Sequence, residues 1–489
     1  MLVGWQAAVV VLFSVAIAVA LLFPGGAVAA AVLGIAVPVF LLARRAPHVV
    51  ICLTFAFLCF EQFIFTLVST QAILFIKVLP DVILLAVTLA IGDKVFRRRG
   101  SSHMGIAILA LAVFMVLVSG FVNGIRSDDF LYYGRKILRY VPFVLIAPVA
   151  FEGEASKAFF RQVLTLLATI QILAGVIQLW GGEAAYHYFR PTVESVSFGD
   201  YEVPVARTIS VIEGTRLVGT MGTYMDFGLF MLLAGCFLLP WSIDSKIPLA
   251  SRFKSLVLLA AVSCCLVLSF SRMTILGGVI ALGAFLARQR RWTALALYAA
   301  ACALLLMLPF LYAEVVTSSA ERATRIVDRI WATYDFDYLD PRRYTRAFLV
   351  FAVAPAVLAD SPLFGLGPGF SRMSVLALPS WNLPLYMADN GYVSLLVQHG
   401  LFGVGLFLSF MTWLLHSLGK AWAVARSTEQ RQLIVSLITY LSALLVVHFF
   451  VDVLTVRYVS FAFWLCCGMA VGLIADLRNG PAPSSARPA

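Results

Sequence analysis

Arginine is the residue type whose placement in this chain most suggests chemistry. A guanidinium group pairs with phosphate oxygens through two parallel hydrogen bonds in a fixed geometry, which suits it better than lysine to grip a phosphate. The arginines that the hydrophobic pattern does not require are Arg207, Arg216, Arg272, Arg322, Arg325, Arg329, Arg342, Arg343 and Arg346. The sequence therefore predicts a cationic site that handles an anionic substrate.

Two of these arginines stand in short patterns beside apolar stretches. In residues 214–222, Arg216 and a glycine-rich backbone come just before an apolar stretch. In residues 269–274, Arg272 occupies a tight connection between two apolar stretches, where a charge is costly unless it faces water, headgroups or a ligand. Arg216 and Arg272 are therefore the first candidates for anion binding.

Two further patterns follow along the chain. The third runs from Arg346 through a helical stretch to the glycine-rich residues 360–370. The fourth comprises residues 389–396, which begin Asp-Asn-Gly-Tyr, and is followed by Gly400 and Gly403 inside the next apolar stretch. All four patterns are expected on the same face of the molecule.

The composition indicates which elements must position these residues. Of 489 residues, 62% are hydrophobic and 12% are charged, and the mean hydropathy is +0.95. Such a chain is too apolar for one soluble core, so it is predicted to be an all-α, polytopic integral membrane protein. The net charge of +11 does not indicate nucleic acid, because cytoplasmic loops of membrane proteins are enriched in Lys and Arg. The cysteines all fall inside apolar stretches and are expected to be buried.

A length of about 20 apolar residues defines a membrane-spanning helix. By this measure about fourteen spans are predicted, at residues 4–23, 27–43, 49–69, 71–92, 104–122, 136–152, 158–180, 222–241, 254–271, 273–288, 292–312, 391–417, 432–452 and 457–476. Alternate loops carry clustered cations, for example residues 97–99, and the positive-inside rule assigns this side and both termini to the cytoplasm. The first span lacks a charged start and a cleavage site, so it is expected to be retained.

The spans are expected to form one domain, residues 1–478, followed by a short disordered cytoplasmic tail, residues 479–489. Two long polar segments, at roughly 182–221 and 313–390, are predicted on the periplasmic side, and the larger is predicted to be partly helical.

Some charged residues fall inside the predicted spans. Lys77 and Asp81 are four residues apart on one predicted helix and are expected to neutralise one another, while Glu61 has no obvious partner. The cations of residues 135–139 begin the predicted span 136–152. They either add to the anion site or meet lipid headgroups.

Together the four patterns resemble those of the O-antigen ligase and O-antigen polymerase superfamily of bacterial envelope glycan enzymes. The resemblance extends over about residues 205–415 and includes loop lengths and topology. Members join glycans at the periplasmic face of the inner membrane and take the donor from undecaprenyl pyrophosphate. The resemblance implies that Arg216 and Arg272 bind the donor. In the ligase branch a histidine precedes the asparagine of the fourth pattern, whereas this chain has Asp389, so the polymerase branch is favoured.

Glycan transfer from a polyprenyl diphosphate needs groups that hold the departing pyrophosphate and a base that takes the proton of the acceptor hydroxyl. Arg216 and Arg272 are predicted to be catalytic in the first role and Asp389 in the second, with Asp226 and Asp452 as weaker candidates for the base. The residues predicted to bind substrate are Arg346, Arg343, Asn390, Tyr392, Arg207 and Arg457. No metal site and no cofactor are expected, because no His, Cys and carboxylate cluster has ligand spacing.

These residues also have purely structural alternatives. Arg216 and Arg272 could anchor helix ends to lipid phosphates. The arginines of residues 322–346 could form the polar face of an interfacial helix. Asp389 and Asn390 could do no more than cap the helix that follows.

The predicted function is polymerisation of undecaprenyl-pyrophosphate-linked repeat units of exopolysaccharide or O-antigen, at the periplasmic face of a bacterial inner membrane. The expected partners are the lipid-linked glycan donor and acceptor and the membrane lipids, with a flippase and a chain-length regulator as further candidates. One alternative is a ligase that transfers finished glycan to lipid A core or to a protein. An alternative of another class is a transporter or lipid-linked glycan flippase, although carriers usually gather their polar groups at the membrane midplane.

Overall fold

The computed structural model describes residues 26–68, 70–125, 127–189, 195–198, 201–204, 217–244, 248–269, 271–291, 293, 296–297, 353–368 and 390–479. The helices of these ranges are α2 (Gly26–Arg45), α3 (Pro47–Leu67), α4 (Thr70–Arg97), α5 (Arg99–Val122), α6 (Ser127–Leu138), α7 (Phe143–Ala150), α8 (Glu154–Tyr188), α9 (Tyr224–Ile243), α10 (Leu249–Leu268), α11 (Arg272–Arg288), α15 (Ala354–Asp360), α17 (Gly391–Val424), α18 (Thr428–His448) and α19 (Arg457–Asn479). Two short strands, β1 (Ser195–Phe198) and β2 (Tyr201–Pro204), form an antiparallel hairpin in the predicted loop 182–221. The expected all-α polytopic membrane fold is confirmed.

In the described part of the chain, eight helices are long and apolar enough to cross a membrane: α3, α5, α8, α9, α10, α17, α18 and α19. The predicted span 4–23 lies outside the described residues, and 292–312 lies almost wholly outside them. The count of about fourteen spans and the division into one domain therefore stay predictions.

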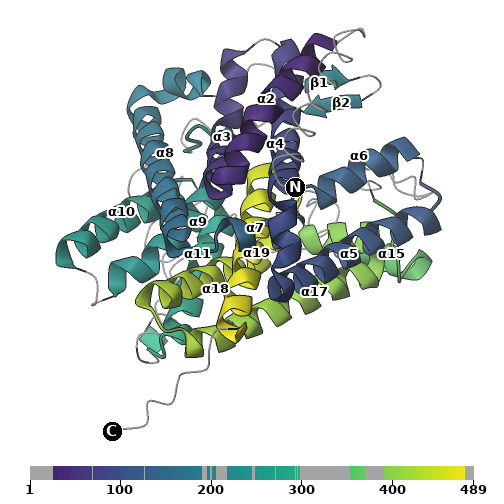
Figure 1. Cartoon of the computed structure of the whole chain (residues 1–489). Coiled ribbons are helices and arrows are strands. Elements are labelled where there is room, and N and C mark those ends of the chain that lie inside the picture. The colour runs from purple at the N-terminus through teal and green to yellow at the C-terminus, as the bar shows by residue number, and fades with distance from the viewer. Residues whose placement is uncertain are drawn as a thin grey trace, which may run out of the picture.

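Helix α19 occupies the centre of the bundle (Figure 1), in contact with α3, α5, α7, α9, α17 and α18. Its membrane-spanning window is 94% buried, as expected for a helix that is apolar around its whole circumference. At Gly468 the backbone of α7 comes so close that an added Cβ would overlap the carbonyl of Phe143. A glycine is therefore required at this helix crossing.

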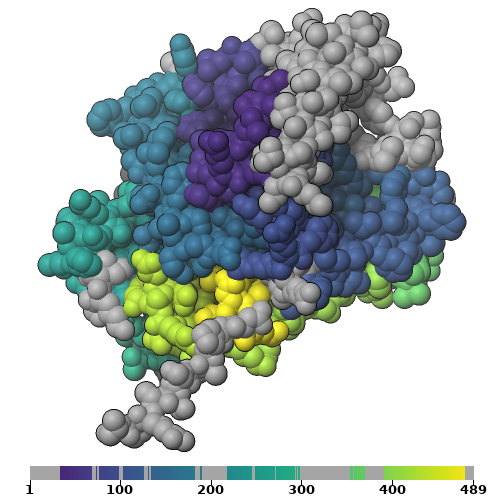
Figure 2. Space-filling model, viewed as in Figure 1, coloured from purple at the N-terminus to yellow at the C-terminus, as the bar shows by residue number. Residues whose placement is uncertain are grey.

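Helix α10, in contrast, lies at the edge of the bundle, and only 11% of its window is buried. Figure 2 shows α8 and α10 forming much of one side of the molecule. Large apolar side chains such as Phe253 and Leu256 are exposed on α10. In a bilayer these side chains face lipid.

One predicted span is wrong. The span expected at 136–152 is broken, because α6 ends at Leu138 and α7 begins at Phe143. The break falls at Pro142, which lacks a backbone N–H and fits the start of a new helix better than a helix interior. Helix α8 continues to Tyr188, while its candidate membrane span ends at Gly181, so the loop expected at 182–221 stays a prediction.

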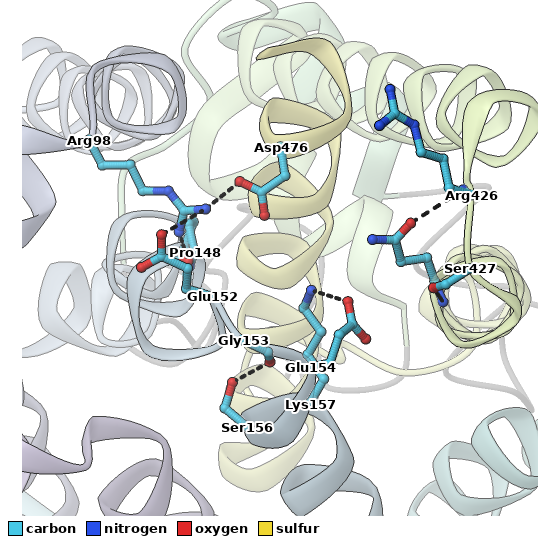
Figure 3. Close-up of polar contacts among 11 residues, drawn as sticks. Arg98, Pro148, Glu152, Gly153, Glu154, Ser156, Lys157, Arg426, Ser427 and Asp476 are labelled. Carbon is cyan, nitrogen blue, oxygen red and sulfur yellow. Dashed lines mark hydrogen bonds and ion pairs between the residues drawn. The ribbon is translucent and has the colours of Figure 1, made fainter. Parts of the chain in front are cut away.

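The loops predicted to be cytoplasmic meet at one end of the bundle (Figure 3). Arg98, between α4 and α5, makes an ion pair with Asp476 of α19 and donates a hydrogen bond to the carbonyl of Pro148 in α7. Its guanidinium also lies 3.8 Å from a carboxylate oxygen of Glu152. These segments therefore share one surface, while its orientation toward the cytoplasm stays a prediction.

Candidate functional site

Only part of the predicted site lies within the described residues. Arg272, Asn390, Tyr392 and Arg457 are described. The predicted site residues outside the described ranges are Asp389, Arg216, Arg346, Arg343 and Arg207. The roles assigned to this second group stay predictions.

The end of the bundle opposite Arg98 carries the first residues of α9, α11, α17 and α19, and we call it the outer end. Gly277 of α11 packs against Val447 of α18, since a Cβ added to this glycine would lie 2.8 Å from the valine side chain. Arg272 precedes Gly277 in α11, and Asp452 follows Val447 just beyond the end of α18. Both therefore lie on the outer side of this contact.

The first and second sequence patterns are neighbours at the outer end. The described chain resumes directly after Arg216, and there the backbone N–H of Leu217 donates to the carbonyl of Leu268, 3.3 Å away. Leu268 is the last residue of α10 and shortly precedes Arg272. A Cβ on Gly228 of α9 would lie 2.6 Å from the hydroxyl of Thr274 in α11 and 2.9 Å from that of Ser269, so the α10–α11 connection also packs tightly on α9.

The glycine-rich segment after Arg216 is held by two buried glutamines of α8. Gln178 accepts hydrogen bonds from the amides of Val218 and Gly219, at 3.1 and 3.0 Å. Gln171 accepts one from the amide of Thr220, also at 3.0 Å. These amides are thus already used within the protein and do not point to a phosphate-binding loop. Sequence reasoning missed both glutamines, which carry no local signal inside an apolar helix.

The fourth pattern begins helix α17. The side chain of Asn390 accepts a hydrogen bond from the amide of Val393, so this residue does cap α17. Tyr392 donates its hydroxyl hydrogen bond to the carbonyl of Leu445 in α18, at 2.8 Å. Whether Asn390 and Tyr392 also contact substrate stays a prediction.

A histidine from another helix lies beside this pattern. His448, the last residue of α18, is fully buried, and a Cβ added to Gly391 would overlap its ring. The ring of Tyr392 packs edge-on against His448, with 4.8 Å between centroids. This neighbour could not be predicted from the sequence, because more than fifty residues separate it from the fourth pattern.

Asp452, in the connection between α18 and α19, is a buried carboxylate at the outer end. It accepts hydrogen bonds from the hydroxyl of Ser394 at 2.8 Å and from the amide of Leu454 at 3.2 Å. Gln398 donates in turn to Ser394, at 2.9 Å. Burial raises the pKa of Asp452 to about 6, while the Ser394 hydrogen bond and the charge of Lys136 oppose the rise. A carboxylate with such a pKa is suited to accept a proton near neutral pH.

Arg457 begins α19 and makes an ion pair with Glu61 of α3. The Glu61 side chain is only 6% exposed, whereas that of Arg457 is 27% exposed. The next residue, Tyr458, donates a hydrogen bond to the backbone carbonyl of Asp226 in the first turn of α9, at 2.5 Å. Glu61 thus has a partner that sequence reasoning did not find, and Arg457 is held at the outer end.

The third and fourth patterns meet at a kink in α17. Gly400 leaves the helical conformation, with φ of 65° and ψ of −165°, and frees the backbone groups around it. The segment after α15 supplies partners: Leu366 donates its amide to the carbonyl of Val397, and Leu401 donates to that of Pro362 at 2.8 Å. Irregular backbone at membrane depth needs such pairing. Gly400 therefore has a structural role, because it allows the break in α17 that the segment after α15 packs against.

Fold and site together define a multi-pass membrane protein whose candidate site residues, among those described, lie at the outer end of the bundle. A family model described as O-Antigen ligase matches residues 256–408. No curated protein matches the chain. The resemblance to the O-antigen ligase and polymerase superfamily is confirmed over the matched residues, and the match implies a membrane enzyme of the glycosyl-transfer type. Arg272 lies within the match, whereas Asp452 and Arg457 lie beyond it.

Proposed function

We propose that the protein is a polymerase of polyprenyl-diphosphate-linked oligosaccharide repeat units, acting at the periplasmic face of a bacterial inner membrane without a metal or cofactor. The observation that carries the proposal is the buried Asp452, which shares the outer end with Arg272 and lies close in sequence to Arg457. A proton acceptor and cations are the two kinds of group that this transfer requires.

In the proposed reaction, the hydroxyl oxygen of the acceptor sugar forms a bond to the anomeric carbon of the donor. The bond from that carbon to the diphosphate oxygen breaks, and the diphosphate leaves with the bonding electrons. Arg272 and Arg216 hold the negative charge that develops on the diphosphate. The first residues of α11, α17 and α19 lie at the same end, where helix dipoles also favour an anion.

Asp452 takes the hydroxyl proton in this scheme. The sequence favoured Asp389, which lies outside the described residues. Asp452 is supported instead because its pKa of about 6 leaves it ionised at neutral pH, and because Ser394 and Leu454 fix its orientation. Asp226 lies in the first turn of α9 and stays a weaker candidate for the base, as predicted from the sequence.

Ligation of finished glycan to lipid A core or to a protein is the second candidate. The sequence favours polymerisation because Asp389 stands where the ligase branch has a histidine. His448, however, lies against Gly391 and brings a histidine to the fourth pattern in space. In cells the two functions differ: loss of a polymerase leaves single repeat units attached to the acceptor, whereas loss of a ligase leaves none attached.

Transport of a lipid-linked glycan is the rival of another class. A direct test uses the purified full-length protein in detergent, where no second compartment exists, with a diphosphate-linked repeat as the only substrate. Wild-type protein is expected to release polyprenyl diphosphate and to form a ladder of longer glycans. Arg272→Ala should abolish the ladder, while Arg98→Ala, at the opposite end, should retain it. A wild-type protein that forms no ladder would overturn the proposal.

A further inference from the structure

A chain of hydrogen bonds leads from Asp452 along one face of α17. Ser394 donates its hydroxyl hydrogen bond to the carboxylate at 2.8 Å, and Gln398, one helical turn further along α17, donates to the oxygen of Ser394 at 2.9 Å. All three side chains are buried. The carboxylate is therefore connected to the interior of α17 through two neutral polar groups.

The order of donation in this chain follows from the chemistry of its members. An ionised carboxylate can only accept, and a serine hydroxyl has one hydrogen to donate. Inside a helix that hydrogen commonly goes to the carbonyl four residues earlier, which here belongs to Asn390 and already accepts from the amide of Ser394. A hydroxyl hydrogen turned toward Gln398 would meet the N–H of its amide. Gln398 thus leaves the Ser394 hydrogen directed at Asp452.

The kink in α17 fixes the backbone at Gln398. The carbonyl of Gln398 loses its helical partner, the amide of Phe402, which donates instead to the carbonyl of Leu363 at 3.1 Å. The hydroxyl of Ser119 in α5 donates to the Gln398 carbonyl in its place and also lies 2.8 Å from the carbonyl of Phe364. Figure 1 shows α5, α15 and α17 side by side. Gln398 is therefore held both by α5 and by the segment after α15.

Other elements bring charged groups to this region. Burial is the main cause of the raised pKa of Asp452, and Lys136 of α6 opposes the rise through its charge. His448 ends α18 four residues before Asp452. The charged groups around Tyr140 are joined in ion pairs: Arg457 with Glu61, and Arg139 with Asp81. Ser394 and Gln398 are neutral, so substitutions there leave every one of these charges in place and change only hydrogen bonds.

We propose that Ser394 and Gln398 are positioning residues for Asp452: Ser394 holds the carboxylate, and Gln398, fixed by the kink in α17, directs the Ser394 hydroxyl toward it. This inference rests on the proposed function, in which Asp452 takes the proton of the acceptor hydroxyl. It also gives the third and fourth sequence patterns a common role. The segment after α15 supports the kink that places Gln398 behind Ser394.

The test titrates the Asp452 carboxyl by infrared spectroscopy on the purified full-length protein in detergent, through the band of the protonated carboxyl that Asp452→Asn removes. A hydrogen bond to the ionised form favours that form, so its loss raises the pKa of the carboxyl. Ser394→Ala should therefore raise the midpoint from about 6 by about one pH unit, whereas Ser394→Thr, which keeps a hydroxyl, should restore it.

Gln398→Met should raise the midpoint in the same direction by a smaller amount. The double variant of Ser394→Ala with Gln398→Met should match Ser394→Ala alone, because Gln398 acts on the carboxyl through Ser394. The matched control is Ser417→Ala, which removes a buried serine hydroxyl in the far half of α17 and should leave the midpoint unchanged. A double variant whose shift equals the sum of the two single shifts would overturn the role of Gln398.

The rate of elongation of a diphosphate-linked repeat is measured on the same proteins across the same pH range. The acidic limb of the rate profile should move with the infrared midpoint in Ser394→Ala and in Gln398→Met. Wild-type midpoints in both variants would overturn the inference while leaving the proposed function standing, even if the rates fell uniformly, because a uniform loss indicates a structural role. A wild type that titrates as expected but elongates no repeat would overturn the proposed function.

Discussion

The pKa of Asp452 leads to a quantitative prediction for the pH dependence of glycan transfer. Burial raises this pKa from the usual 3.8 to about 6. With a pKa of about 6, about 91% of the carboxyl groups are ionised at pH 7 and about 9% at pH 5. An unperturbed aspartate would remain about 94% ionised at pH 5.

Because a general base acts in its ionised form, kcat/KM should fall about tenfold between pH 7 and pH 5. The assay is elongation of a diphosphate-linked repeat by the purified protein, with initial rates measured across this range. Asp452→Asn should lower the rate at pH 7 by about 10²- to 10⁴-fold and remove the acidic limb of the profile. The Asp389→Asn variant, with its rate measured in parallel across the same pH range, tests whether Asp389 is the base instead.

A flat profile from pH 7 to pH 5 in the wild type would refute this reasoning. So would an Asp452→Asn variant that retains the acidic limb, because another group would then be titrating.

Further variants test the structural part of the account by thermal unfolding in detergent. Asp452→Asn should raise the free energy of unfolding at pH 7 by up to about 3 kcal/mol. Because the pKa of Asp452 is raised in the folded state, the wild type loses stability as the pH rises through about 6, whereas asparagine does not ionise. An unchanged Tm would contradict this prediction. Glu61→Gln should lower the free energy of unfolding by about 3 kcal/mol, because it leaves Arg457 without its carboxylate. Adding Arg457→Met should restore part of the loss. Failure of that rescue would argue against the ion pair. Gly400→Ala should lower the free energy of unfolding by at least about 2 kcal/mol, because the backbone conformation at this position excludes a side chain and a Cβ would overlap Leu363. The control Gly405→Ala, with nothing within 4 Å of the added Cβ, should be neutral or stabilising. Equal effects of the two substitutions would contradict the kink.

Much of the fold could be predicted from hydropathy because the bilayer imposes a long apolar run on each span. The exceptions have local causes. Pro142 divides an apolar run that hydropathy treats as continuous, and the kink at Gly400 lies inside a single predicted span. A window average of side-chain hydropathy is insensitive to either backbone effect.

The site could be predicted only where its residues stand in local patterns. Arg272 and Asn390 were identified as candidates in this way, at the ends of apolar stretches, and their roles stay predictions. The pairing of Glu61 with Arg457 joins positions 396 residues apart, and no single sequence specifies which distant charges meet. Asp452 was identified as a carboxylate, but its burial and its bond to Ser394 depend on how α17 packs against the α18–α19 connection.

The measurement that tests the central claim most directly is an electron cryomicroscopy structure of the full-length protein with a bound polyprenyl diphosphate. The account predicts density for a diphosphate at the outer end, with its oxygens within about 3 Å of the guanidinium of Arg272. Density at the opposite end beside Arg98, or a diphosphate at the outer end that contacts no arginine, would contradict it.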